Sequence, residues 1–194
     1  MKIDVLQGWH RYTELMHAQT TPNTKAMLDN MRHHLKYELL CDPKLFETMI
    51  PEPEYKFYSS FSGGILKGKP AVEGFYHDMW DSQSSLVELT VDLCSADDWG
   101  VACEGAWIQQ CPGESLVSQG RDVDKDTWYL ASSRIAWFFP YEKIDGKMRL
   151  VGEIIYGDDE GMTFTKLAKD DVLTLEEAKA SFAALDAEEL GEVK

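Results

Sequence analysis

The sequence predicts an α+β protein in which a curved, mostly antiparallel sheet wraps around N-terminal helices and leaves a cone-shaped interior. In the first third of the chain, apolar residues recur at helical spacing, whereas from residue 86 onward short strand-like segments alternate with turn residues. Helices and strands that are segregated in this way favour α+β over a parallel βαβ sheet. The chain has 194 residues, which is enough for one domain with its own apolar core.

The first third of the chain is predicted to be helical. The apolar face of a first helix consists of Val5, Trp9, Tyr12 and Met16. Thr24 is the expected N-cap of a second helix, and Asp42 followed by Pro43 is expected to open a short third helix that runs through Met49. Pro51 and Pro53 end the helical region, because proline cannot donate to the helical hydrogen-bond ladder.

The rest of the chain is predicted to be mostly strands. Residues 54–61 are rich in strand formers, residues 63–68 form a glycine-rich loop, and Lys69-Pro70 opens a helix. The strands expected after it cover residues 86–93, 101–109, 115–123, 128–139 and 148–156. Asp145-Gly146 is a hairpin signal, and Thr174-x-x-Glu177 is a capping box that opens a C-terminal helix.

Charge and composition exclude several classes of partner. Asp plus Glu outnumber Lys plus Arg by 34 to 19, and the resulting net charge of −15 disfavours nucleic acid and anionic membrane surfaces. No apolar run approaches the ~18 residues of a membrane span, and the N-terminus shows no signal peptide. The four cysteines show no C-x-x-C pair, so we expect free thiols and a cytoplasmic location.

Two motifs fall short of a binding site. Gly63 to Lys69 matches the start of a Walker A loop, but Pro70 stands where Ser or Thr would hold magnesium. His34 and Glu38, four residues apart beside His33, place two metal ligands on one helix face, yet no third ligand is apparent. We therefore predict a polar helix face there, with no metal site.

Three ionisable residues interrupt strands that are otherwise apolar. Glu104 stands among small and apolar residues, Arg134 lies in an apolar strand, and Asp158 follows the last strand. An enclosed Arg134 needs an anionic partner, and Glu104 on another strand of the meander is the expected one. The alternative is that strand alternation turns these side chains outward to water. Tyr156 shares the parity of Asp158, and Glu153 has the opposite parity.

Aromatic and hydroxyl side chains suggest how a flat, apolar substrate is held. The candidate substrate-binding residues are Tyr55, Lys56, His77, Trp80, Trp137 and Tyr156. Tyr58 is a candidate general acid, because a tyrosine hydroxyl beside a carboxylate or lysine can donate a proton or polarise a carbonyl.

The chain resembles the nuclear transport factor two-like superfamily, and within it the SnoaL-like group is the nearer match. The resemblance rests on Gly68-Lys69-Pro70-Ala71-Val72-x-Gly74-Phe75-Tyr76 and on the strand pattern that ends in Gly152-Glu153-Ile154-Ile155-Tyr156-Gly157-Asp158. It covers roughly residues 24 to 160 as a pattern of elements. We therefore divide the chain into an N-terminal helical extension (residues 1–22), a SnoaL-like domain (residues 23–162) and an acidic helical tail (residues 163–194).

The resemblance implies a cone-shaped α+β barrel, a homodimer, and acid–base chemistry in an apolar pocket without a cofactor. It places Asp158 where epoxide hydrolases of the superfamily carry a catalytic aspartate, but the arginine expected beside Glu104 on its strand is missing. We therefore expect a lyase that acts on a small aromatic or polycyclic substrate, with Glu104, Asp158, Tyr58 and Arg134 as the catalytic residues. The alternatives are an isomerase, dehydratase or epoxide hydrolase in the same pocket, and a non-catalytic binding or adaptor protein.

Overall fold

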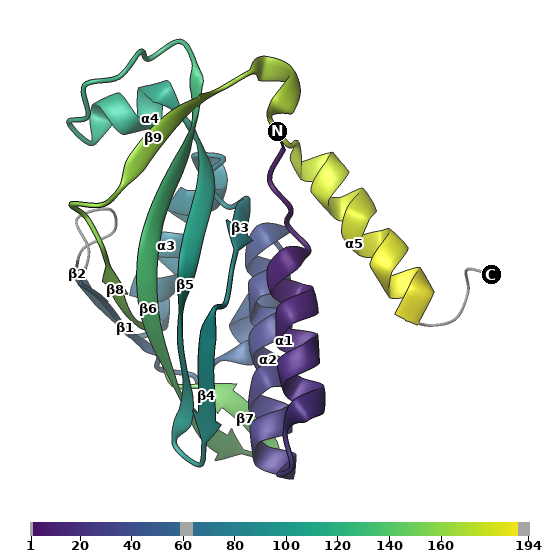
Figure 1. Ribbon diagram of the computed structural model, residues 1–194. Helices are drawn as coiled ribbons and strands as arrows, with labels where there is room; N and C mark the ends of the chain where they lie inside the picture. Colours follow the sequence, from purple (N-terminus) through teal and green to yellow (C-terminus); the bar gives the residue numbers. More distant parts are fainter. Residues whose placement is uncertain (1, 59–63, 190–194) are drawn as a thin grey trace.

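The computed structural model describes residues 2–58 and 64–189 (Figure 1). Its α-helices are α1 (Gln7–Ala18), α2 (Pro22–Leu39), α3 (Lys69–Asp81), α4 (Gly113–Ser118) and α5 (Leu175–Glu189), with 3-10 helices η1 (Pro43–Thr48) and η2 (Lys169–Asp171). Its strands are β1 (Glu54–Tyr58), β2 (Gly64–Lys67), β3 (Val87–Leu89), β4 (Leu93–Asp97), β5 (Gly100–Pro112), β6 (Trp128–Ile144), β7 (Lys147–Leu150), β8 (Ile154–Gly157) and β9 (Thr163–Leu167). The predicted α+β class is confirmed.

The strands form one mixed sheet that is not closed. Its main order is β2-β1-β8-β6-β5-β3, while β4 pairs with β5, and β7 and β9 pair with β6. Within the described chain, β1 and β8 form the one parallel pair of strands, and the other strand pairs are antiparallel. The long strands β5 and β6 are therefore the spine on which the shorter strands assemble (Figure 1).

Helices α1 and α2 lie side by side against the sheet, and α3 lies farther round on the side of β1 and β2 (Figure 1). Between the helices and the sheet lies a single large apolar core, to which α1 contributes Trp9 and Tyr12 and α5 contributes Phe182. The N-terminal and C-terminal helices thus share the core of the central region. Among the described residues, none of the helices combines the length and apolarity that a bilayer crossing requires.

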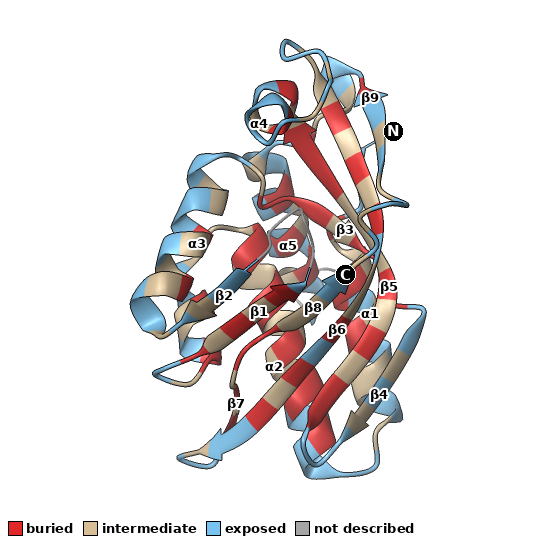
Figure 2. Cartoon of the chain, turned by 90° about the vertical axis from the view of Figure 1, so that its left-hand side faces the viewer, coloured by how far each residue is buried: buried red, intermediate tan, exposed pale blue. Residues whose placement is uncertain are grey.

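Strand alternation decides which side chains enter this core. Along β6, buried and exposed residues alternate (Figure 2): Trp137 and Phe139 are buried, whereas Arg134 and Phe138 are exposed. Because β6 pairs with β5 over the full length of β5, the same two-residue period sorts the side chains of both strands. One face of this pair therefore lines the interior, and the other forms the outer surface.

Several predicted elements are corrected. Of residues 115–123, predicted as a strand, residues 115–118 belong to helix α4, and residues 119–123 form neither helix nor strand. Leu116 on this helix is fully buried in a small cluster with Tyr129 and Ala131. The N-cap of α2 is Thr21, whose side chain accepts a hydrogen bond from the N–H of Thr24, and residues 64–67 of the expected loop form strand β2. Of the residues predicted around that loop, positions 59–63 lie outside the described residues.

Two predicted strands are each divided in two. Residues 86–93 contain β3 and then the start of β4, and residues 148–156 contain β7 and then β8. The second division falls at Gly152, where a Cβ atom would overlap the backbone oxygen of Glu54. Only a glycine allows this close approach to β1, and it sets the position of the next residue, Glu153.

Other local signals are confirmed. Asp145 and Gly146 both have positive φ (50° and 79°), as a two-residue hairpin turn requires. At α5, Thr174 Oγ1 accepts a hydrogen bond from the N–H of Glu177, and Glu177 Oε2 accepts one from the N–H of Thr174. Cys41, Cys94, Cys103 and Cys111 are free thiols.

Candidate functional site

A cavity of about 270 Å³ lies between the helices and the inner face of the sheet. Its walls are largely apolar and include Phe57, Phe75, Trp107, Trp137, Phe139 and Ile155. The ionisable groups among its described lining residues include His34, Glu38 and Glu153, and no lysine or arginine. The volume is just below the lower end of the roughly 300–1,000 Å³ typical of ligand pockets, so it suits a small molecule.

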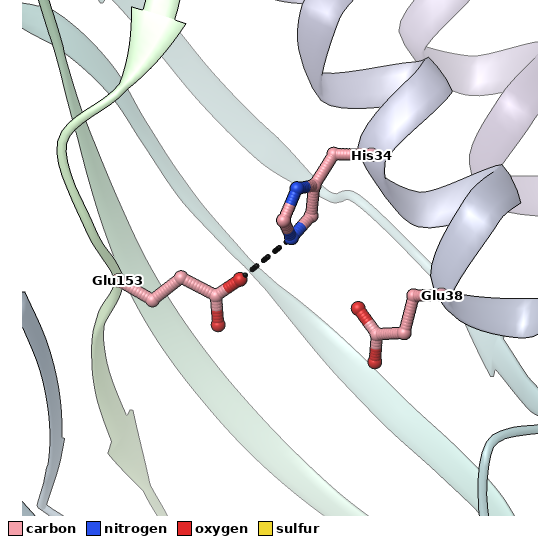
Figure 3. A group of neighbouring side chains, drawn as sticks. All are labelled: His34, Glu38 and Glu153. Carbon is pink, nitrogen blue, oxygen red and sulfur yellow. Dashed lines mark hydrogen bonds and ion pairs between the residues drawn. The ribbon is translucent and has the colours of Figure 1, made fainter. Parts of the chain in front are cut away.

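His34, Glu38 and Glu153 form a cluster in the wall of this cavity, which we call the His-Glu-Glu cluster (Figure 3). His34 and Glu38 come from successive turns of α2, and Glu153 immediately precedes β8. All three residues are buried, with 2%, 8% and 5% of their surface exposed, respectively. The expected polar helix face is therefore wrong: these positions of α2 face the interior.

The orientation of the His34 ring is fixed by η1. His34 Nδ1 lies 2.6 Å from Thr48 Oγ1, and the Thr48 hydroxyl donates its only proton to the backbone oxygen of Leu45. Nδ1 must therefore carry the proton that it donates to Thr48. The other ring nitrogen, Nε2, lies 3.0 Å from Glu153 Oε1 and 3.0 Å from the hydroxyl oxygen of Tyr76.

A second set of hydroxyls completes the surroundings of Glu153. Tyr76 on α3 donates its hydroxyl proton to Glu153 Oε1 at 3.1 Å, and Tyr55 on β1 lies 2.9 Å from the Tyr76 oxygen. The Tyr55 hydroxyl also donates a hydrogen bond to Met49 Sδ at 3.0 Å. Burial raises the pKa of both tyrosines well above its usual range, so both hydroxyls stay protonated. Both hydroxyls are therefore available as hydrogen-bond donors beside Glu153.

Glu38 differs from Glu153 in having no such partners. Within the described chain no group forms a hydrogen bond with its carboxyl oxygens, although its backbone oxygen accepts a hydrogen bond from Trp80 Nε1 at 3.1 Å. Burial, and secondarily the charge of Glu153, raise the pKa of Glu38 well above the usual value. A free carboxyl therefore stands in an apolar cavity beside a carboxylate that is held by an imidazole and a phenol.

The expected pair of Glu104 and Arg134 forms, but on the outer face of the sheet. Arg134 Nη2 contacts Glu104 Oε1, and Nη1 lies 2.5 Å from Asp92 Oδ2. The side chains of Arg134 and Glu104 are 47% and 37% exposed, respectively. The prediction that both side chains lie inside the pocket is therefore wrong. Strand alternation turns them outward to water, which was the alternative considered from the sequence.

Asp158 and two tyrosines also lie outside the cavity. Asp158 is exposed, and its carboxylate accepts a hydrogen bond from the N–H of Gly161 in the turn after β8. Tyr58 and Tyr156 are about half exposed and stack on each other on neighbouring strands, with ring centroids 4.7 Å apart. The prediction that these groups surround an enclosed substrate is also wrong, because their positions along the strands turn their side chains outward.

The remaining candidate residues are divided between the interior and the surface. Trp137 lines the cavity, and Tyr55 and Trp80 stand behind it through their contacts with Tyr76 and Glu38. Lys56 forms an ion pair with Glu54 at 2.8 Å, and His77 is exposed on α3. Lys56 and His77 therefore do not line the cavity.

The sequence did not assign His34, Glu38, Glu153 or Tyr76 to the site, although His34 and Glu38 were noted as two metal ligands on one helix face. Two signals were present: Glu38 follows the apolar Leu35 by three positions on α2, and Glu153 has the parity opposite to Asp158. Neither signal shows which parity faces inward. The third member of the cluster was hidden because it lies 119 residues from His34 in the chain.

No family model matches the chain, and no curated protein matches its sequence. Solved structures do match. One is a protein assigned as a polyketide cyclase from Xanthomonas campestris (TM-score 0.53, 16% identity, 70% of this chain and 93% of that one). Another is assigned as a SnoaL-like polyketide cyclase from Jannaschia sp. (TM-score 0.52, 12% identity, 72% and 90%). A nuclear transport factor two-like protein from Anabaena variabilis has a TM-score of 0.51 at 13% identity (74% and 97%).

The chain has the nuclear transport factor two-like fold. SnoaL-like proteins are among the structures that share it, in agreement with the resemblance seen in the sequence. At these identities the likeness concerns the fold, and the chemistry has to be argued from the cavity itself.

Proposed function

We propose that this protein is a cofactor-independent lyase that acts on a small, ring-containing molecule held in the cavity. The observation that carries the proposal is the buried Glu38 carboxyl, which has no hydrogen-bond partner among the described residues and faces an aromatic-lined cavity. Burial raises the pKa of this carboxyl above that of an exposed one, which is the direction in which enzymes shift a catalytic carboxyl.

The His-Glu-Glu cluster supplies the two proton sites that an elimination needs. Glu38, in its carboxylate form, takes a proton from a carbon of the substrate, and the electrons of that C–H bond form the new double bond as the leaving group departs. A proton held between His34 Nε2 and Glu153 passes to the leaving group, and the proton that Glu38 took then moves to the His34–Glu153 pair, which restores the starting state of the enzyme. If Glu38 instead returns its proton to another carbon, the same site acts as an isomerase.

The proposal includes the substrate class, the oligomeric state and the location of the protein. Two of the structures that share the fold are assigned as polyketide cyclases, which supports a ring-containing substrate. We propose a cytoplasmic homodimer, and the exposed rings of Tyr58, Phe138 and Tyr156 on the outer face of the sheet support a contact between two copies there.

The test is turnover by Glu38→Gln, once a substrate has been found by incubating the protein with one- and two-ring ketones, alcohols and phenols and detecting products by mass. Glutamine keeps the shape of Glu38 but cannot take a proton, so kcat is expected to fall by about 10²–10⁴. Glu104→Gln and Asp158→Asn are the matched controls, and both are expected to retain wild-type turnover.

Three outcomes separate the alternatives. Release of two fragments, or loss of water, identifies a lyase, whereas a product of unchanged mass identifies an isomerase. Full activity of Glu38→Gln contradicts the assignment of the base. Ligands that raise the melting temperature without ever being converted indicate a non-catalytic binding protein.

A further inference from the structure

The His-Glu-Glu cluster has the composition of a metal site as well as that of a proton-transfer site. His34 Nε2 and one carboxylate oxygen each from Glu38 and Glu153 lie within 4.8 Å of one another. One imidazole and two carboxylates are ligands that zinc and related divalent transition metals accept. No pattern in the sequence indicated a third ligand for His34 and Glu38. The fold brings Glu153, in the segment before β8, to that place.

The imidazole is already arranged as a metal ligand. Because Nδ1 of His34 donates a hydrogen bond to Thr48, the neutral form of the ring has its lone pair on Nε2, which lies within 4.8 Å of a carboxylate oxygen of Glu38 and of Glu153. Metal-binding histidines are held in this way, with the far ring nitrogen donating to a neighbouring oxygen. Tyr76 gives Glu153 the corresponding support through its hydroxyl.

The charge balance of the cavity favours a cation. The two buried carboxyls stand together, and the described lining residues include no lysine or arginine to compensate them. Glu38 is 92% buried, points toward the centre of the cluster, and has no hydrogen-bond partner among the described residues (Figure 3). A carboxylate in this position is stabilised when it coordinates a cation.

We infer that His34, Glu38 and Glu153 form a binding site for a divalent transition-metal cation of the zinc class. Donor atoms on one tetrahedral zinc ion are about 3.4 Å apart, so the side chains must close slightly, and Glu38 is free to do so. The cavity side of the ion is left for water or a ligand oxygen. The cation and the transferable protons occupy the same lone pairs, so bound metal excludes the proton transfer proposed above.

The experiment is calorimetric titration of the full chain with Zn²⁺, after treatment with a chelator and dialysis, compared with Glu38→Gln and Glu142→Gln. The Glu38 side chain forms no hydrogen bond with a described residue, and its hydrogen bonds are made by the backbone oxygen, so the first variant is expected to keep the fold, as the melting temperature will show. Glu142 is an exposed carboxylate on β6 and serves as the matched control.

We expect one Zn²⁺ per chain, and a loss of affinity of at least about 100-fold in Glu38→Gln, because a direct ligand matters more than an outer partner worth 10–100-fold. Glu142→Gln is expected to bind like the wild type. Co²⁺ in place of Zn²⁺ is expected to give visible d–d absorption that Glu38→Gln abolishes. Weaker binding of Mg²⁺ than of Zn²⁺ is also expected, since Mg²⁺ gives up its water reluctantly.

Absence of stoichiometric binding, or equal binding by the wild type and Glu38→Gln, would overturn the inference. These measurements use no substrate, so they separate the two proposals. If Glu38→Gln abolishes turnover while Zn²⁺ binding is unchanged, the lyase proposal stands and the metal site falls. The reverse result leaves the metal site and removes the assigned base.

Discussion

Glu38 and Glu104 are carboxylates of the same kind with opposite environments. Glu104 lies at the surface beside Arg134 and Asp92, where water screens the ion pair. Glu38 lies in an apolar cavity, where burial raises its pKa. Residue type and neighbours in the sequence made Glu104 the more conspicuous candidate, whereas Glu38, because of its environment in the fold, is the residue that we propose for the chemistry.

At the residue scale, Thr48 is predicted to stabilise the site because its hydroxyl oxygen accepts a hydrogen bond from the Nδ1–H of His34. Thr48→Val keeps the volume but leaves that buried donor without a partner, so the free energy of unfolding is expected to fall by about 1–3 kcal/mol. Urea denaturation measures the loss. Thr165→Val, at an exposed position of β9, is the control and is expected to change stability little. Equal stability of the two variants would show that the Thr48 contact is unimportant.

At the element scale, the segment between β7 and β8 places Glu153. The chain leaves β6 with β7, passes close to β1 at Gly152, and then enters the sheet as β8, parallel to β1. Along β8 and the residues that flank it, the side chains of Glu153 and Ile155 face the cavity, and those of Tyr156 and Asp158 face outward. Gly152 thus allows the close approach to β1 that precedes β8, and the register of β8 decides which carboxylate reaches the site.

Gly152→Ala is predicted to disturb this element. Its Cβ would overlap the backbone oxygen of Glu54, so β1 and β8 must separate, with a loss of stability and a displaced Glu153. Gly74→Ala is the matched change: nothing lies within 4 Å of a Cβ there, and alanine in a helix is expected to stabilise by about 0.5–1 kcal/mol. Thermal denaturation compares them, and a Gly152→Ala variant as stable as Gly74→Ala would refute the close approach.

At the scale of the whole molecule, both terminal helices belong to one core. Trp9 on α1 contacts Phe182 on α5 with ring centroids 6.1 Å apart, and both side chains are buried. Lys36 on α2 forms an ion pair with Asp186 at 2.6 Å, and Lys2 forms one with Glu177. Helix α5 thereby covers the side of α1 and α2 that faces away from the cavity.

Phe182→Ala is therefore predicted to destabilise the whole protein, by about 3–5 kcal/mol, because it leaves a void in a buried cluster. Phe138→Ala removes the same ring from the outer face of the sheet, where it is 36% exposed, and is expected to cost much less. Chemical denaturation gives both values. Similar losses in the two variants would contradict the inclusion of α5 in the core.

The sequence by itself determined those features that depend on neighbouring residues. Apolar spacing placed α1, α2 and α3, the capping box placed the start of α5, and Asp145-Gly146 placed the hairpin between β6 and β7. Each of these signals involves residues that are close together in the chain, so it predicts local structure without knowledge of the fold. The α+β class follows from the order of these elements.

Only the tertiary structure decided which face of each strand is buried and which distant residues meet. Residues 113–118 form a helix that buries Leu116, and the register of β8 turns Glu153 inward and Asp158 outward. A two-residue period is the same whichever face is inside, so the sequence left that choice open. The meeting of Glu153 with His34 and Glu38 arises from packing between α2 and the sheet, and no local pattern encodes it.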